Sequence, residues 1–258
     1  MKEIDLTLEI SNTCNFKCDM CYLEKKDNVS KSFMNIETVQ EFANQIENSS
    51  YKIKVLRIFW AGEPLMNPDF DNIIKILSKM DKVERIAFDT NASLLDSQKI
   101  STLIELASVK PVHIIFSLDG YSDEIYRNIR KGGNFFEVMK NIETFIIKYS
   151  NSIHSQNIKT MVQFVVHPLN CHELKDFINH WRNFYQNNNL DFNIFLNQSM
   201  ALDNGVNIRP LTVQSDEMGI SQQNANILYE KTLKESGIIN HNQKILNFSQ
   251  GGGKIEIQ

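Results

Sequence analysis

The sequence predicts an α/β fold whose strands are mostly parallel. Three observations support this class. Strand-like and helix-like segments alternate along the first 197 residues, in six strand–helix repeats. The 258 residues have an ordinary globular composition, with 42% hydrophobic and 22% charged residues. Polar loops follow several of the strand-like segments, as expected when helical crossovers join parallel strands.

The first part of the chain alternates strand and helix patterns. Residues 4–10 alternate apolar and polar side chains, which is typical of a strand, and lead directly into a cysteine-rich loop. Residues 36–46 have the apolar spacing of a helix, with Asn35 as its N-cap. Residues 53–60 predict the second strand. Residues 69–80 place their apolar side chains on one helical face.

The same alternation continues further along the chain. Residues 85–88 predict a short strand, and Asp96 is expected to cap a helix that ends at residue 107. Residues 112–116 predict an apolar strand. A helical region over 123–149 follows, interrupted near Gly132. The last predicted elements are a strand over 160–166, a helix over 171–185 and a strand over 190–196.

The pattern weakens after Asn197. We therefore expect a core over residues 1–197 and a C-terminal tail over 198–258. The tail contains a helical pattern over 224–234 and a short end, Lys254–Ile257, without an obvious partner. It covers the site, pairs at a sheet edge, is loosely ordered, or begins an extension that is truncated here.

Four unusual loops, at 11–21, 61–64, 89–92 and 117–120, each follow a predicted strand. The carboxyl ends of parallel strands meet at one edge of the sheet, whether the sheet is doubly wound or closes toward a barrel. The four loops are therefore expected to build one composite site.

Composition excludes some functions. The net charge of −4 and a pI near 5.9 argue against general binding to nucleic acid or to an anionic membrane. No apolar run is long enough to span a bilayer, and the N-terminal residues lack the apolar core of a signal peptide. The clustered cysteines do not form a secreted disulfide pattern. We expect a cytoplasmic protein.

The cysteines carry the strongest chemical signal. Cys14, Cys18 and Cys21 fall within eight residues, while Cys171 lies far away. Three thiolates in one loop can converge on a zinc or iron–sulfur centre, and the missing fourth ligand leaves a coordination position open. The competing interpretation is a structural zinc site completed by a histidine or solvent. The sequence has no histidine before His113, which favours a cluster.

The run CNFKCDMC matches CxxxCxxC and is followed by AGEP, TNA and SLDG at the predicted strand ends. Together these motifs resemble the radical S-adenosylmethionine (radical SAM) superfamily over residues 4–196. The run SLDG…YRNIRKGGNFFEVMKNI looks most like the SPASM or twitch maturase branch, but the auxiliary-cluster cysteines of that branch are absent from this sequence. The resemblance implies a partial (β/α)6 TIM-like barrel.

The resemblance also implies a chemistry. Three thiolates would bind three irons of a [4Fe–4S] cluster, and SAM would chelate the fourth iron. An electron from a donor such as flavodoxin or ferredoxin would cleave SAM to a 5′-deoxyadenosyl radical, which abstracts hydrogen from a peptide or small-molecule substrate. We expect a role in peptide or natural-product modification. The alternatives are a small radical SAM enzyme of modified-nucleoside or sugar metabolism and a non-enzymatic zinc-binding module.

Several cofactor contacts follow from the resemblance alone. Glu63 of Ala61-Gly62-Glu63-Pro64 would accept a hydrogen bond from the methionine ammonium of SAM. Gly62 would permit close backbone approach, although Ala61 departs from the family's GGEP. Met20 would lie near the adenine.

Ser117, Asp119, Asn91 and Arg130 complete the predicted site. The resemblance implies that Ser117 contacts the SAM carboxylate or ribose and that Arg130 pairs with the carboxylate. Asp119 is a further cofactor candidate, although an Asp-Gly pair also favours a plain turn. Asn91 is equally compatible with a turn, and Arg130 with a solvated helix face.

Overall fold

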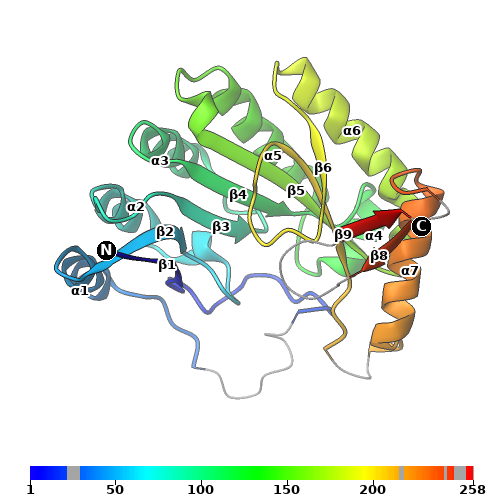
Figure 1. Ribbon diagram of the computed structural model, residues 1–258, viewed down its shortest axis with the longest axis horizontal. Coiled ribbons are helices and arrows are strands. Elements are labelled where there is room, and N and C mark those ends of the chain that lie inside the picture. Colours follow the sequence, from blue (N-terminus) through cyan, green and yellow to red (C-terminus); the bar gives the residue numbers. More distant parts are fainter. Residues whose placement is uncertain (22–29, 215–217, 241–242, 247–253, 258) are drawn as a thin grey trace.

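Seven parallel strands form one curved sheet in the order β1-β2-β3-β4-β5-β7-β6 (Figure 1). The computed structural model describes residues 1–21, 30–214, 218–240, 243–246 and 254–257. The strands are β1 (Lys2–Thr7), β2 (Tyr51–Arg57), β3 (Ile86–Thr90), β4 (Val112–Ser117), β5 (Ile158–Val166), β6 (Asn193–Leu196) and β7 (Gly205–Pro210). The predicted α/β class with parallel strands is confirmed.

Helices lie along the outer side of this sheet (Figure 1). They are α1 (Ile36–Glu47), α2 (Phe70–Ser78), α3 (Ser97–Ala107), α4 (Asp123–Ile129), α5 (Phe135–Ser150), α6 (Leu174–Asn187) and α7 (Gln222–Glu235), with short 3₁₀ turns η2 (Pro64–Met66), η3 (Ser155–Asn157) and η4 (Cys171–Glu173). Among the described residues, none of the helices has both the length and the apolar composition needed to cross a bilayer.

Local capping explains where the helices begin. The Asn35 side chain accepts a hydrogen bond from Thr38 N at 2.9 Å, and the Asp96 side chain accepts one from Lys99 N at 2.9 Å. Both predicted caps are confirmed. The predicted helical interruption is also present, because α4 ends at Ile129 and α5 begins at Phe135, with Gly132 in a left-handed conformation (φ +96°) between them.

The two faces of the sheet differ in what they contact. Alternate residues of β4, such as Ile114 and Phe116, belong to the main hydrophobic core beneath the helices. On the other face, Ile115 packs with Met161 and Ala201 in a small separate cluster. This second, concave face points toward the site, so polar residues at alternate strand positions can reach it.

Several predicted strand ends differ from the observed ones. The strand predicted over 4–10 ends at Thr7, and the one over 53–60 ends at Arg57. In contrast, β3 extends to Thr90, two residues beyond the prediction. Apolar residues past each ladder, such as Ile10 and Ile58, are buried without being in a strand, which is why the hydrophobic pattern alone extended those predictions.

The sheet continues past residue 197. Strand β7 pairs with β5 on one side and with β6 on the other, although no strand was predicted there. Beyond it, α7 confirms the helix predicted over 224–234. Strand β9 (Lys254–Ile257) pairs antiparallel with β8 (Gln243–Leu246) in a separate two-stranded sheet. Residues 215–217 and 247–253 of the tail fall outside the described part of the chain.

Candidate active site

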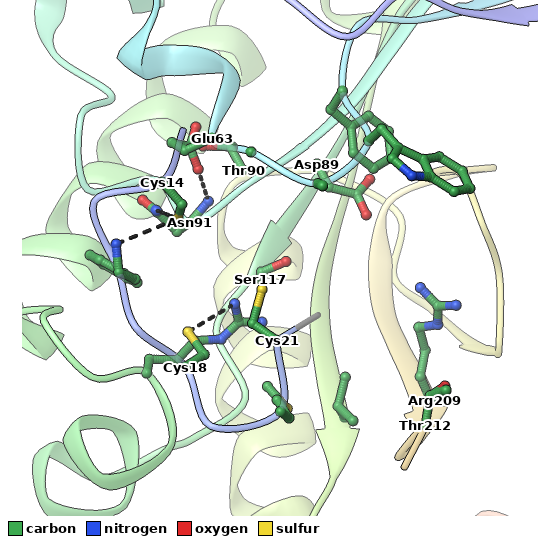
Figure 2. A pocket seen from close by; sticks show the side chains of 18 of the residues that line it. Cys14, Cys18, Cys21, Glu63, Asp89, Thr90, Asn91, Ser117, Arg209 and Thr212 are labelled. Carbon is green, nitrogen blue, oxygen red and sulfur yellow. Dashed lines mark hydrogen bonds between the residues drawn. The ribbon is translucent and has the colours of Figure 1, made fainter. Parts of the chain in front are cut away.

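A cavity of about 370 Å³ opens at the carboxyl ends of the strands (Figure 2). Its volume is in the range of small-molecule sites. All four predicted loops contribute to this region, and every predicted site residue except Asp119 lines the cavity. Those residues are Cys14, Cys18, Met20, Cys21, Gly62, Glu63, Asn91, Ser117 and Arg130.

The three clustered cysteines are free thiols on one side of this cavity. Cys18 is buried, and Cys14 and Cys21 are half-buried. Phe16 N donates a hydrogen bond to Cys14 Sγ at 3.4 Å. Arg130 Nη1 lies 3.9 Å from Cys18 Sγ. Burial raises the pKa of the Cys14 thiol to about 11, so its surroundings disfavour a bare thiolate.

The loop that carries the cysteines, residues 11–21 (the cysteine loop), is fixed from several directions. Lys17 N donates to Lys131 O at 2.8 Å, on the segment that follows α4. The Lys131 side chain also donates to Asp19 at 2.6 Å. On the other side, Glu63 N donates to Thr13 O at 2.8 Å. The loop is therefore held against both the AGEP segment and the segment after α4.

Glu63 is buried behind the cysteine loop, with its carboxylate bound by the chain itself. Its Oε1 accepts from Leu65 N at 3.0 Å and from Thr90 Oγ1 at 2.7 Å, while Oε2 accepts from Asn91 N at 2.7 Å. Burial raises the pKa of Glu63, and these donors act against that shift. Oε2 keeps acceptor capacity, because a carboxylate oxygen can accept two hydrogen bonds.

Asn91 connects three loops of the site. Its backbone binds Glu63, and its side chain Nδ2 donates to Asn15 Oδ1 at 3.0 Å and lies 3.9 Å from Cys14 Sγ. Its Oδ1 accepts from Ser93 N and from Ser93 Oγ, at 2.9 and 2.7 Å. Both sequence interpretations of Asn91 are thus compatible with its position, since it forms a turn and also lines the cavity.

Gly62 is packed against the cysteine loop. A Cβ at this position would lie 2.1 Å from Ser11 O and 2.8 Å from Thr13 N, both backbone atoms. The close backbone approach expected for Gly62 is therefore an approach to the chain's own cysteine loop.

Asp119 and Arg130 form a buried ion pair beside the cysteines. The Asp119 side chain is fully buried, with Oδ2 accepting from Arg130 and Oδ1 accepting from Val165 N at 2.7 Å. Its left-handed backbone (φ +57°) fits the turn interpretation. Arg130 lines the cavity, so it does not lie on a solvated helix face.

Met20 and Ser117 both line the cavity, from different loops. Met20 is half-buried and packs against the main core from the cysteine loop. Ser117 is the last residue of β4, in register with Gln163 of β5, and its side chain faces the cavity (Figure 2).

The structure adds cavity residues that were not predicted, including Trp60, Asp89, Arg209 and Thr212. Asp89 was interpreted as part of a loop but lies within β3. Arg209 lies on β7, where Val206 and Ile208 alternate with Asn207 and Arg209. That alternation is a strand signal and could have identified this wall of the site.

The donor set fits an iron–sulfur cluster. The described residues contain no group of three His, Cys, Asp or Glu side chains that could hold one metal ion. A [4Fe–4S] cluster does not require such a group, because each thiolate binds a different iron. Three free thiols lining one cavity beside Glu63 and Arg130 match a cluster that keeps one iron open to a ligand with amino and carboxylate groups.

Comparison with known proteins shows a family. The family model described as Radical SAM superfamily matches residues 8–179. The GTP 3′,8-cyclase of Clostridium botulinum (strain Hall) is 31% identical over 175 residues, which are 67% of this chain and 51% of that protein. The GTP 3′,8-cyclase of Limosilactobacillus fermentum is 28% identical over 178 residues, 67% of this chain and 49% of that protein. The chain thus spans about half the length of the curated relatives it matches.

Solved structures show the same fold at low identity. The structure of native anSMEcpe with bound AdoMet and Cp18Cys peptide matches with a TM-score of 0.58 and 16% identity, covering 91% of this chain and 59% of that one. HydG, a maturase of the [FeFe]-hydrogenase, matches with a TM-score of 0.53 and 12% identity, covering 90% of this chain and 50% of that one. The predicted partial TIM-like barrel is confirmed by this likeness.

Proposed function

This chain belongs to the radical SAM superfamily, and on that premise we propose that it abstracts a hydrogen atom from a peptide or another small natural product. As an enzyme of this family its cofactors are a [4Fe–4S] cluster and SAM, which together supply a 5′-deoxyadenosyl radical by one-electron cleavage of the SAM sulfonium bond. The zinc-binding alternative is therefore set aside.

One observation carries the proposal: the three free thiols share a cavity with Glu63, Asn91, Ser117 and Arg130 at one edge of the parallel sheet. We assign Cys14, Cys18 and Cys21 as the cluster ligands. The Arg130 guanidinium beside Cys18 would offset negative charge on the thiolates.

We assign the SAM contacts to the cavity residues around the cysteine loop. The Glu63 carboxylate, through the free acceptor site on Oε2, would bind the methionine ammonium. Arg130 or Ser117 would bind the carboxylate, and Met20 would pack on the adenine. Asn91 holds the cysteine loop in place for these contacts, and Gly62 lets the neighbouring backbone approach that loop closely.

Two further parts of the proposal concern partners and compartment. Enzymes of this family need an electron donor and a substrate, and we propose flavodoxin or ferredoxin as the donor. We also propose a cytoplasmic location, because free clustered thiols persist in a reducing compartment.

A nucleotide is the second candidate substrate. Relatives named GTP 3′,8-cyclase favour it, since they match 67% of this chain. The discriminating assay incubates the reduced enzyme and SAM with GTP, or with a candidate precursor peptide, and measures substrate-dependent 5′-deoxyadenosine and altered substrate by mass spectrometry.

The class of enzyme is tested by anaerobic reconstitution. Iron, sulfide and zinc are quantified per chain, and 5′-deoxyadenosine is measured after adding SAM and reductant. We expect a cluster in the wild type and in Cys171→Ala, and its loss in Cys18→Ala. Stoichiometric zinc without iron, or a Cys18→Ala variant that retains a full cluster, would refute the assignment.

A further inference from the structure

The cavity has a second wall, formed by β7, that the cofactor assignment does not use. Arg209 extends from this strand into the cavity (Figure 2). Its Nε donates to Asn197 Oδ1 at 3.3 Å and its Nη1 lies 3.5 Å from Gln163 Oε1. Gln163 Oε1 also accepts from Asn207 Nδ2 at 3.3 Å. Neutral side-chain amides therefore hold the guanidinium in place.

The charge of Arg209 is not neutralised by these amides. Arg57 forms an ion pair with Asp5, and Arg127 forms one with Asp123. In contrast, within the described part of the chain no carboxylate lies within 4.0 Å of Arg209. A guanidinium has five N–H donors, and two of those of Arg209 are directed at amides. The remaining donors are available to an anion in the cavity.

Asp89 lies on the concave face of β3 and lines the same cavity. Its Oδ1 is buried and has no hydrogen-bond partner among the described residues. Burial raises the pKa of Asp89 to about 7, although Arg209, Arg57 and Arg130 act against this shift. A buried polar atom without a partner is costly, and native proteins rarely keep one unless a ligand or water completes it.

Both residues lie on the side of the cavity away from Cys14 and Cys18 in Figure 2. Both line the same cavity, and the charge of Arg209 acts on Asp89, but no ion pair within 4.0 Å joins these two described residues. A group bound in the cavity between them can therefore contact both. Its chemistry follows from theirs: an oxyanion suits the planar donor fork of arginine, and a hydroxyl or amine suits the unpartnered carboxyl oxygen.

We propose that Arg209 and Asp89 form a substrate-recognition pair, in which Arg209 binds a carboxylate or phosphate oxyanion of the substrate and Asp89 accepts a hydrogen bond from a neighbouring hydroxyl or amine. This inference rests on the proposed function, which assigns the cavity residues around the cysteine loop to the cluster and SAM. It narrows the substrate to a molecule with an anionic group near a hydrogen-bond donor.

Simple anions test the pair without the unknown substrate. Trp60 lines the cavity and is 70% exposed, while the only other tryptophan, Trp181, is fully buried in the core. The intrinsic fluorescence of the cluster-loaded protein is titrated with inorganic phosphate and, separately, with acetate. A lower dissociation constant for phosphate than for acetate indicates a phosphorylated substrate. The reverse order indicates a substrate with a carboxylate.

We expect a saturable change in the wild type and a dissociation constant raised about 10-fold or more in Arg209→Gln, as expected for the loss of a charge-assisted hydrogen bond. Arg209→Lys keeps the charge without the planar fork, so its dissociation constant should lie between those of the wild type and Arg209→Gln. At a pH above the raised pKa of Asp89, about 7, Asp89→Asn removes a negative charge and should tighten phosphate binding. Arg127→Gln, at an exposed arginine, is the matched control and should match the wild type.

Three outcomes would overturn the pair: no saturable response to either anion, equal affinity in wild type and Arg209→Gln, or displacement of the anion by added SAM. The last would assign Arg209 to the cofactor. Iron content and 5′-deoxyadenosine formation of the wild type are measured in parallel. A wild type without iron would contradict the proposed function, whereas a loaded wild type without an anion response contradicts only the pair.

Discussion

Arg130 donates a hydrogen bond to the fully buried carboxylate of Asp119, and its Nη1 lies 3.9 Å from the Cys18 sulfur. The Asp119 side-chain oxygens accept from Arg130 and from Val165 N, and Asp119 is not among the residues that line the cavity. We infer that Asp119 positions Arg130 beside the cysteines and does not contact SAM directly.

Asp119→Asn should destabilise the fold and disturb the cysteine loop. It leaves the buried Arg130 charge unpaired, which costs about 3–5 kcal/mol. Urea unfolding followed by circular dichroism measures the loss. Asp123→Asn breaks the exposed pair with Arg127 and should cost about 0–1 kcal/mol. Equal losses in the two variants would contradict a structural role for the Asp119–Arg130 pair.

Gly62→Ala should displace the cysteine loop. The added Cβ meets the Ser11 backbone at 2.1 Å, and such overpacking costs about 1–3 kcal/mol. We expect lower stability and less iron retained per chain after reconstitution. Ala61→Gly adds no atom and keeps the hydrogen bond from the backbone N–H of residue 61 to Glu9 Oε1, which measures 2.8 Å. It therefore serves as the control. A Gly62→Ala protein with full iron content would show that the loop adapts freely.

Asn91→Ala and Asn15→Ala separate a positioning role from a cofactor contact. Each removes the hydrogen bond between these two side chains, which contributes about 1 kcal/mol. If Asn91 only holds the loop, both variants should lose the cluster faster to a chelator, to a similar extent. If Asn91 also contacts SAM, its variant alone should bind SAM more weakly in equilibrium dialysis. Unchanged cluster loss in both would contradict the positioning role.

Asp89 should make stability fall as pH rises. Burial raises its pKa from 3.8 to about 7, while Arg209, Arg57 and Arg130 favour its ionised form and Glu63 disfavours it. Between these pH values the folded protein holds a proton that the unfolded chain releases, so the free energy of unfolding decreases as pH rises through this window. Asp89→Asn should show a smaller decrease in urea titrations from pH 4 to 7. Parallel curves would contradict the raised pKa.

The boundary expected near residue 197 has a direct test. Strand β7 lies between β5 and β6, and Asn204 Oδ1 accepts from Thr160 N at 3.0 Å across that junction. We expect a fragment ending at Asn197 to lack cooperative unfolding, because removing β7 exposes the β5 edge and the core face beneath it. A fragment that melts cooperatively would support an independent core over 1–197.

The sequence predicted best those features that depend on local chemistry. The helix caps at Asn35 and Asp96 need only a side chain and the next turn of backbone. The cysteine spacing and the four loops were recognisable because each motif lies at a strand end. The curvature that brings these loops around one cavity is a tertiary property, and it was expected only from the topology of parallel strands.

The missed features depend on partners distant in sequence. Strand β7 has only six residues, follows β6 without an intervening helix and pairs with β5, which lies more than 30 residues earlier. Arg209 and Asp89 line the same cavity only because β7 pairs with β5. No spacing rule in the sequence links them.

The cysteine loop is held by Lys131, by Glu63 and by Asn91 through hydrogen bonds that involve only the chain. Ordering a loop residue costs about 1–2 kcal/mol of conformational entropy, and these hydrogen bonds offset part of that cost with contacts that do not involve a metal. Cluster assembly then meets a preorganised set of thiols, so more of the metal–sulfur binding energy remains as affinity. A chain stripped of iron should accordingly keep the shape of its site and reload without refolding.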